Sequence, residues 1–259
     1  MEGGLFNNII KLDNRVMKIS RRDSEISNQV MEEMNSRTPE EYAKDINELG
    51  IKTARIFSSF DCSDYVVLIQ EFIDGRTIQS ILNDKNSSIN EKIKVFDKFI
   101  DVYQKSEPND NLCLDWNMKN FILKDDEIYY VDLTPALYKD KIRESNSENL
   151  KQYRDSYLDK NIQLAGILGY AIMPFLEYKT KEEASIIFRK FNLILKEKLD
   201  FILDITDLKH VYLYKLSQIV DYLSSDLSYK NMKNNISSYS MEKISKYPED
   251  KSVVVRRRT

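Results

Sequence analysis

The segment at residues 113–135, CLDWNMKNFILKDDEIYYVDLTP, constrains the fold of this chain more than any other. It contains two apolar and aromatic runs, at 121–123 and 128–131, which are separated by the polar residues 124–127. Short apolar runs on either side of a polar turn are typical of a β-hairpin. A polar loop precedes the first run. The segment therefore predicts a short strand, a loop and a tight hairpin.

Three polar residues mark the ends of these predicted elements. Asp115 opens the loop, Asn120 closes it five residues later, and Asp132 follows the second strand. We therefore expect the three side chains to converge at one end of the hairpin. A carboxylate that orients a hydroxyl, with an amide oxygen and a second carboxylate for Mg²⁺, suits phosphoryl transfer. The alternative is an ordinary loop beside a strand, since Asp and Asn are common turn formers.

This pattern resembles the protein-kinase-like superfamily, and more narrowly its aminoglycoside phosphotransferase and choline kinase branch of small-molecule kinases. The loop of that branch has the form H-G-D-x-x-x-x-N, and a metal-binding Asp ends a strand about a dozen residues later. Cys113-Leu114 replaces the usual His-Gly here, and residues 133–134 are Leu-Thr in place of Phe-Gly. The resemblance implies that Asp115 is the catalytic base and that Asn120 and Asp132 bind Mg²⁺.

The first twenty residues predict two strands, at 5–12 and 15–20, around a turn. Gly3 and Gly4 precede them, and a glycine-bearing turn in kinases lets backbone amides approach nucleotide phosphates. Lys18 lies in VMKIS, which resembles the V-A-I-K strand whose lysine contacts the α- and β-phosphates. A lysine in an apolar strand needs an anionic partner or a path to solvent. The alternative is a surface lysine on an edge strand.

The resemblance also implies a helical glutamate that pairs with Lys18. The sequence predicts one helix up to about residue 35 and a second that begins with a capping box at Thr38. Glu33 lies on the apolar face of the first helix. Glu41 already has a role as the capping-box residue of the second. We therefore predict that Lys18 pairs with Glu33, with Glu41 as the alternative.

Two further strands, at 51–60 and 65–73, are predicted before an abrupt change to a polar sequence. Glu71, Phe72 and Ile73 resemble the hinge between kinase lobes, whose backbone binds the adenine edge. We therefore predict an α+β, bilobal, protein-kinase-like fold. Its N-terminal nucleotide-binding lobe comprises residues 1–74, and its helical catalytic and substrate-binding lobe comprises residues 75–259. The predicted helices of the second lobe are 77–83, 90–104, 148–157, 162–173, 182–203, 208–223 and 228–245.

Composition limits the other classes of function. The chain has 259 residues, a net charge of −3, 2 cysteines and 1 histidine, which favours a reducing compartment and disfavours a zinc site. Lysines and acids are interleaved, so no basic face for nucleic acid is expected. The longest apolar run, at 162–176, is shorter than the roughly 20 residues of a membrane span, and no secretory signal is expected. We predict a cytoplasmic protein without nucleic acid or membrane partners.

Together these features predict a Mg²⁺-dependent kinase that transfers the γ-phosphate of ATP or GTP to a hydroxyl of a small molecule. A long segment ending in an A-P-E-like motif does not follow Asp132, which disfavours a regulated protein kinase. Two alternatives stay open. One is an atypical protein Ser/Thr kinase, and the other is a non-catalytic, pseudokinase-type nucleotide-binding module.

Overall fold

The computed structural model describes residues 7–21, 37–62, 65–134, 136–144, 157–178 and 181–201. These residues form a mixed α+β structure, as predicted. The chain divides into two compact units: unit 1 combines Met1–Thr77 with Lys105–Leu158, and unit 2 combines Ile78–Gln104 with Asp159–Thr259. The predicted lobes, 1–74 and 75–259, stay a prediction.

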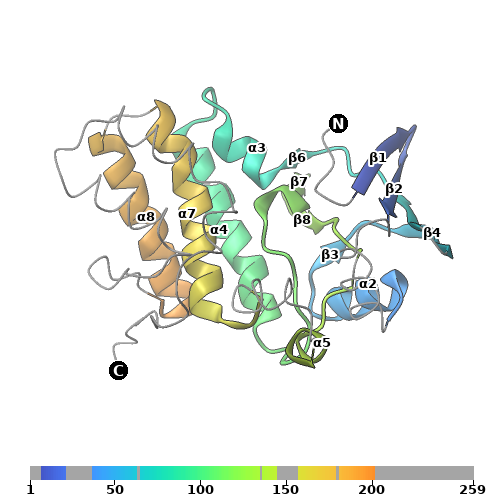
Figure 1. Ribbon diagram of the computed structural model, residues 1–259. Helices are drawn as coiled ribbons and strands as arrows, with labels where there is room; N and C mark the ends of the chain where they lie inside the picture. The colour runs from blue at the N-terminus through green and yellow to red at the C-terminus, as the bar shows by residue number, and fades with distance from the viewer. Residues whose placement is uncertain are drawn as a thin grey trace, which may run out of the picture. The chain divides into compact units, whose positions relative to one another are not determined.

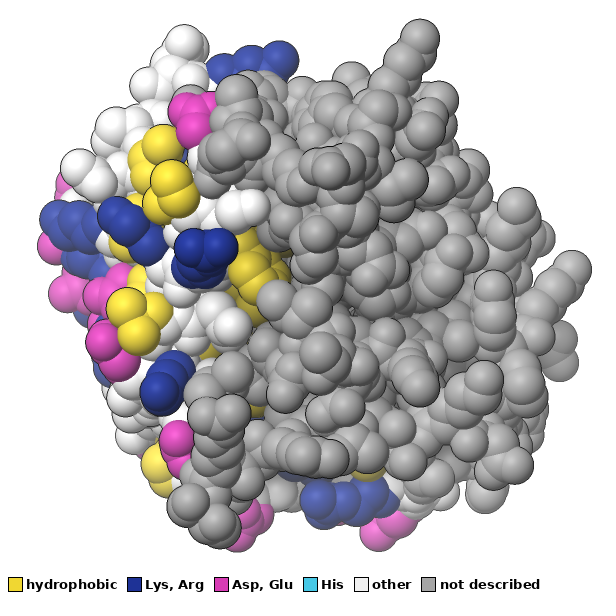
Figure 2. Space-filling view, turned by 90° about the vertical axis from the view of Figure 1, so that its left-hand side faces the viewer, with side chains coloured by type: hydrophobic (Ala, Val, Ile, Leu, Met, Phe, Trp, Pro, Cys, Tyr) yellow, Lys and Arg dark blue, Asp and Glu magenta, His cyan; other side chains and the backbone are white. Residues whose placement is uncertain are grey.

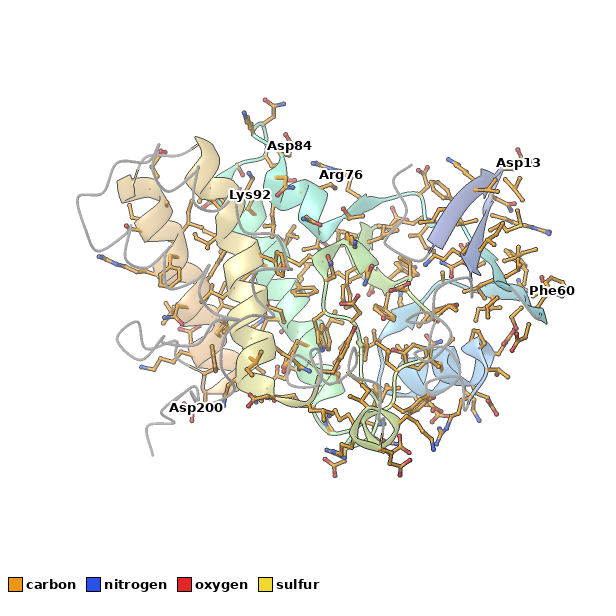
Figure 3. All side chains as sticks on the ribbon, in the orientation of Figure 1. Asp13, Phe60, Arg76, Asp84, Lys92 and Asp200 are labelled. Carbon is orange, nitrogen blue, oxygen red and sulfur yellow. The ribbon has the colours of Figure 1, made fainter. Side chains whose placement is uncertain are left out.

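The first sheet of unit 1 has the strand order β1-β2-β5-β4, and all of its pairs are antiparallel. Its β1–β2 hairpin is as predicted, and Asp13 in the turn has a φ of 51°, which Asp tolerates better than most residues (Figure 3). Alternate residues of its inner strands are buried on one face, as in Val66, Leu68 and Gln70. Its strands are β1 (Asn7–Leu12), β2 (Arg15–Arg21), β4 (Ile56–Cys62) and β5 (Tyr65–Glu71) (Figure 1).

The second sheet of unit 1 has the order β3-β8-β7-β6 and contains the predicted hairpin (Figure 1). Strands β7 and β8 are antiparallel and are joined by Asp125 and Asp126, which have φ values of 48° and 67°. Positive φ at both turn residues is typical of the two-residue turns that match the twist of a hairpin. The strands are β3 (Lys52–Thr53), β6 (Arg76–Thr77), β7 (Phe121–Lys124) and β8 (Glu127–Tyr130).

The prediction of one strand over 51–60 is wrong, because this segment is shared between the two sheets. β3 pairs in parallel with β8, and Ala54 N–H then donates to Tyr130 O at 3.3 Å. The chain re-enters the first sheet at β4, beside β5. The predicted strand at 65–73 is confirmed as β5, which ends at Glu71.

Gly75 brings the segment after β5 into close contact with the hairpin. A Cβ atom at this position would lie 2.4 Å from Leu123 O and 2.8 Å from Ile122 Cγ2. Only glycine permits such an approach of two backbones. The adjoining residues of β6 pair with β7, as in Arg76 opposite Leu123.

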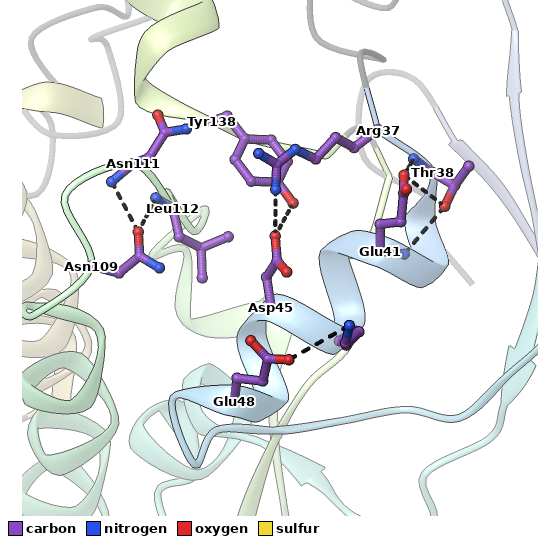
Figure 4. Close-up of polar contacts among 10 residues, drawn as sticks. Arg37, Thr38, Glu41, Asp45, Glu48, Asn109, Asn111, Leu112 and Tyr138 are labelled. Atoms are coloured by element: carbon purple, nitrogen blue, oxygen red, sulfur yellow. Dashed lines mark hydrogen bonds and ion pairs between the residues drawn. The ribbon is translucent and has the colours of Figure 1, made fainter.

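Helix α2 (Pro39–Glu48) begins with the predicted capping box. Thr38 Oγ1 accepts the N–H of Glu41 at 3.2 Å, and Glu41 Oε2 accepts the N–H of Thr38 at 2.8 Å (Figure 4). The helix buries Tyr42, Ala43 and Ile46 on one face. A short helix of unit 1, α5 (Lys139–Glu144), was not predicted.

The described part of unit 2 is helical. Phe96 stacks on Phe191 with a centroid distance of 4.1 Å, and Phe175 meets Phe191 edge-on at 5.8 Å. Lys92 is 1% exposed, and its Nζ donates to Leu82 O at 2.9 Å (Figure 3). The helices are α3 (Ile78–Asn83), α4 (Ile89–Ser106), α7 (Lys160–Tyr178) and α8 (Lys181–Leu199). They confirm the predicted helices at 77–83, 90–104 and 162–173, and the one at 182–203 as far as Leu199. The predicted helix at 148–157 lies outside the described residues except for Tyr157, and those at 208–223 and 228–245 lie outside them entirely.

Helices α7 and α8 carry three large apolar residues that are about half exposed: Tyr170, Ile186 and Leu193. Figure 2 views the side on which α8 lies, and its described part carries apolar, basic and acidic side chains close together. Within the ranges given above, no helix combines the length and the apolar character that crossing a membrane requires.

Candidate active site

The loop before β7 brings Asp115 and Asn120 into direct contact. Asp115 Oδ1 accepts the N–H of Asn117 at 3.0 Å, and Asp115 Oδ2 accepts Asn120 Nδ2 at 3.0 Å. Asn117 also caps the single 3-10 turn η1 (Met118–Asn120). The loop is therefore bonded within itself, which holds the Asp115 carboxylate beside the Asn120 amide as predicted.

Asn120 joins this loop to the end of the hairpin. Its N–H donates to Asn117 O at 2.8 Å, and its backbone carbonyl accepts the N–H of Val131 at 2.9 Å. Its side chain is 8% exposed. Because an ionised carboxylate only accepts hydrogen bonds, Nδ2 faces Asp115 and Oδ1 is left for another partner.

Lys18 reaches the same end of the hairpin from the first sheet. Its Nζ donates to Val131 O at 2.6 Å and lies 3.5 Å from Asp132 Oδ1. Lys18 is 7% exposed, and β2 lies between β1 and β5. The alternative of a surface lysine on an edge strand is therefore wrong. An anionic partner was expected for this lysine, and Asp132 supplies one.

The glutamate predicted to pair with Lys18 cannot be placed, because Glu33 lies outside the described residues. The alternative, Glu41, is exposed and bonded to Thr38 in the capping box. Gly3 and Gly4 also lie outside the described residues.

Gln70 lies beside Lys18 and was not identified from the sequence. Its Nε2 donates to Val131 O at 3.1 Å, so this carbonyl accepts hydrogen bonds from both side chains. Gln70 is 2% exposed, and its Oε1 has no hydrogen-bond partner among the residues that the structure describes. Its signal in the sequence was a polar residue in an otherwise apolar strand, immediately before the predicted hinge.

Of the predicted hinge residues, Glu71 ends β5, and Phe72 and Ile73 follow it as an irregular segment. The N–H of Glu71 donates to Arg55 O at 2.8 Å, and that of Phe72 donates to Asn14 O at 2.9 Å. These two amides are thus engaged by the chain itself. The role of the hinge backbone in binding a base stays a prediction.

The pKa of the Asp115 carboxyl is raised above its ordinary value, first by burial and then by the negative charge of Asp132. Hydrogen bonds from Asn117 N–H and Asn120, together with the charge of Lys119, act in the opposite direction. Asp115 therefore binds a proton more readily than a carboxylate in solvent.

Cys113, at the start of the loop, lies in an environment that makes its thiol unreactive. The residue is 2% exposed, and burial raises the pKa of its thiol to about 12. Its Sγ lies 3.5 Å from Tyr157 O, and its N–H donates to Leu137 O at 3.0 Å. Because the thiolate is the reactive form, Cys113 serves packing and not chemistry.

Asp132 and Asn120 offer one carboxylate and one amide oxygen as ligands for a cation. Mg²⁺ is commonly held in this way, by one or two carboxylates with substrate phosphates and water. Across the described segments, no group of three or more His, Cys, Asp and Glu side chains is placed to hold a metal ion.

No model of a known protein family matches this chain, and no curated protein matches its sequence.

Proposed function

We propose that this chain is a phosphotransferase of a bilobal, kinase-like fold, which moves the γ-phosphate of ATP or GTP to a hydroxyl of a small molecule. The observation that carries the proposal is the meeting of three distant segments. Strand β2 brings Lys18 to Asp132 at the end of β8, and the loop holds Asp115 against Asn120 beside the same strand end. A lysine, an amide and two carboxylates in this arrangement suit phosphoryl transfer.

Asp115 is the base in this proposal. The acceptor oxygen forms a bond to the γ-phosphorus, the bond from phosphorus to the β–γ bridging oxygen breaks, and the acceptor proton passes to the Asp115 carboxylate. Burial raises the pKa of Asp115, which brings it closer to the pH at which a general base works best. The hydrogen bonds from Asn117 and Asn120 fix the direction of this carboxylate.

Lys18 provides the positive charge for the phosphates, and Asp132 with Asn120 would hold Mg²⁺. When bound, Mg²⁺ neutralises the charge of the β- and γ-phosphate oxygens. Val131 O and Asp132 orient the Lys18 ammonium toward the end of the hairpin. Asn120 is fixed by backbone bonds on both sides, so its Oδ1 keeps one position.

Nucleotide binding is tested first, by thermal shift with ATP and GTP, each with and without Mg²⁺. Ligand linkage raises the melting temperature with the logarithm of ligand concentration. Asp132→Asn should abolish the Mg²⁺-dependent part of the shift. Asp125→Asn is the matched control, because it makes the same change at the exposed turn of the same hairpin, where Asn tolerates the φ of 48°.

Transfer is tested next, with a panel of amino sugars, choline-like alcohols, sugars and peptides as acceptors. Asp115→Asn should keep the nucleotide-dependent shift and lose about 10²- to 10⁴-fold in kcat. Transfer to peptides alone would favour an atypical protein kinase. A thermal shift without transfer to any acceptor would favour a nucleotide-binding module, and the absence of any shift at millimolar nucleotide would refute the proposal.

A further inference from the structure

Two buried tyrosines contact the backbone of the loop on either side of Leu114. Tyr42, on α2, donates its hydroxyl to Cys113 O at 2.5 Å. Tyr130, the last residue of β8, accepts the N–H of Asp115 on its hydroxyl at 3.3 Å. Both side chains are 0% exposed. Neither residue belongs to the set that the phosphotransferase proposal uses.

The two hydrogen bonds act on opposite sides of Leu114. The Tyr42 hydroxyl holds the carbonyl of Cys113, and the Tyr130 hydroxyl holds the N–H of Asp115, two residues further on. The backbone that leads into Asp115 is therefore held at two points.

We propose that Tyr42 and Tyr130 are positioning residues, which fix the backbone of Asp115 through these two hydrogen bonds. The inference rests on the proposed function for its catalytic meaning, since Asp115 is the base there. The bond to Cys113 O is buried and the bond from Asp115 N–H is partly buried, and leaving a backbone group away from solvent without a partner is costly. The loop therefore has one favoured position at Asp115, set by a helix and a strand outside it.

The rings hold the hydroxyls in place. The Tyr130 ring packs against Phe121 at 5.0 Å, and the Tyr42 ring meets Tyr130 edge-on at 6.5 Å and Tyr138 at 5.7 Å. Packed aromatic side chains have few alternative rotamers in a dense interior. The carboxylate of Asp115 is then directed by Asn117 and Asn120, while its main chain is fixed by the tyrosines.

Tyr138 supplies a matched control from the same aromatic cluster. Its hydroxyl donates at 2.7 Å to Oδ2 of Asp45, a residue of α2 and not of the loop (Figure 4). Tyr138→Phe removes one hydroxyl beside Tyr42 and leaves the loop bonds intact. Tyr138→Phe therefore shows how much of any change at the loop comes from a general loss of stability in the aromatic cluster.

The test is amide hydrogen exchange by NMR on the full chain, with exchange at Asp115 divided by exchange at the β7 and β8 amides. Tyr130→Phe should raise this ratio about tenfold, which is the effect of one net hydrogen bond. Tyr42→Phe should raise it about threefold, because Asp115 keeps its acceptor while the carbonyl of Cys113, two residues before it, loses the hydrogen bond from Tyr42. Tyr138→Phe should leave the ratio within about twofold of wild type.

An unchanged ratio in Tyr130→Phe, or an equal rise in Tyr138→Phe, would overturn the proposal. If Tyr130→Phe does not fold, Tyr42→Phe decides by the same ratio. Where transfer activity is found, Tyr130→Phe should lower kcat about tenfold with the nucleotide KM within about twofold. The exchange result does not depend on activity, so failure of the phosphotransferase proposal is distinguishable from failure of the positioning one.

Discussion

Replacement of Gly75 by alanine should destabilise unit 1, because the added methyl group collides with the backbone of β7. The new Cβ would lie 2.4 Å from Leu123 O, whereas ordinary contact begins at 3.4 Å. A backbone oxygen cannot rotate away as a side chain can. About 1 Å of backbone displacement is thus needed, in a sheet where Arg76 pairs with Leu123.

Overpacking of this kind costs about 1–3 kcal/mol. At about 2–4 °C per kcal/mol, the melting temperature should fall by about 2–12 °C. The single tryptophan of the chain, Trp116, is a convenient reporter, since it stacks on Phe121 at 5.3 Å in the same unit. The unfolding of unit 1 can therefore be followed by intrinsic fluorescence.

Gly50→Asn is the control for added size. No atom lies within 4 Å of a Cβ built there, and Asn tolerates the φ of 74°. This variant should stay within about 0.5 kcal/mol of wild type. If Gly75→Ala melts as wild type does, or if Gly50→Asn is destabilised as strongly, the steric argument is refuted.

Three other variants test the site and its supports. Asp115→Asn should raise the melting temperature at pH 7, and this gain should vanish as the pH falls toward 3.8, the ordinary pKa of the group. The reason is that the pKa of Asp115 is raised in the folded state, so ionised Asp115 lowers the stability of the fold only above that pH. A gain that persists at low pH would contradict this. Lys18→Met should lower the free energy of unfolding, measured in urea, by about 1–3 kcal/mol, since Val131 O keeps its hydrogen bond from Gln70. It should also remove the nucleotide-dependent shift in melting temperature, and an undiminished shift would exclude Lys18 from nucleotide binding. Thr38→Ala should lower the free energy of unfolding by about 1 kcal/mol, and Thr38→Ser should lower it much less. Equal losses in the two variants would show that the hydroxyl is not the capping group.

Local patterns in the sequence predicted local structure well. The hairpin follows from two apolar runs around Asp125 and Asp126, which both take positive φ. The capping box of α2 follows from Thr38 and Glu41, three residues apart. Each of these features depends on groups within a few residues of one another.

Pairings between distant residues were harder to predict. The break between β3 and β4 depends on a parallel partner, β8, that lies more than seventy residues further along the chain. The hydrogen bond to Cys113 O comes from Tyr42, which the helical pattern marks only as an inward-facing residue. No local rule connects such positions, because tertiary packing alone brings them together.

The discontinuous make-up of unit 1 has a consequence for how the protein is synthesised. The first sheet is complete once β5 has left the ribosome, because its four strands all lie before residue 72. β3 and β6 must wait for β7 and β8, which are translated about fifty or more residues later, and closing such loops carries an entropic cost. During that interval β3 and β6 have no partner strands in the nascent chain. Unpaired strand edges of this kind are the sites at which other chains can join and which chaperones cover.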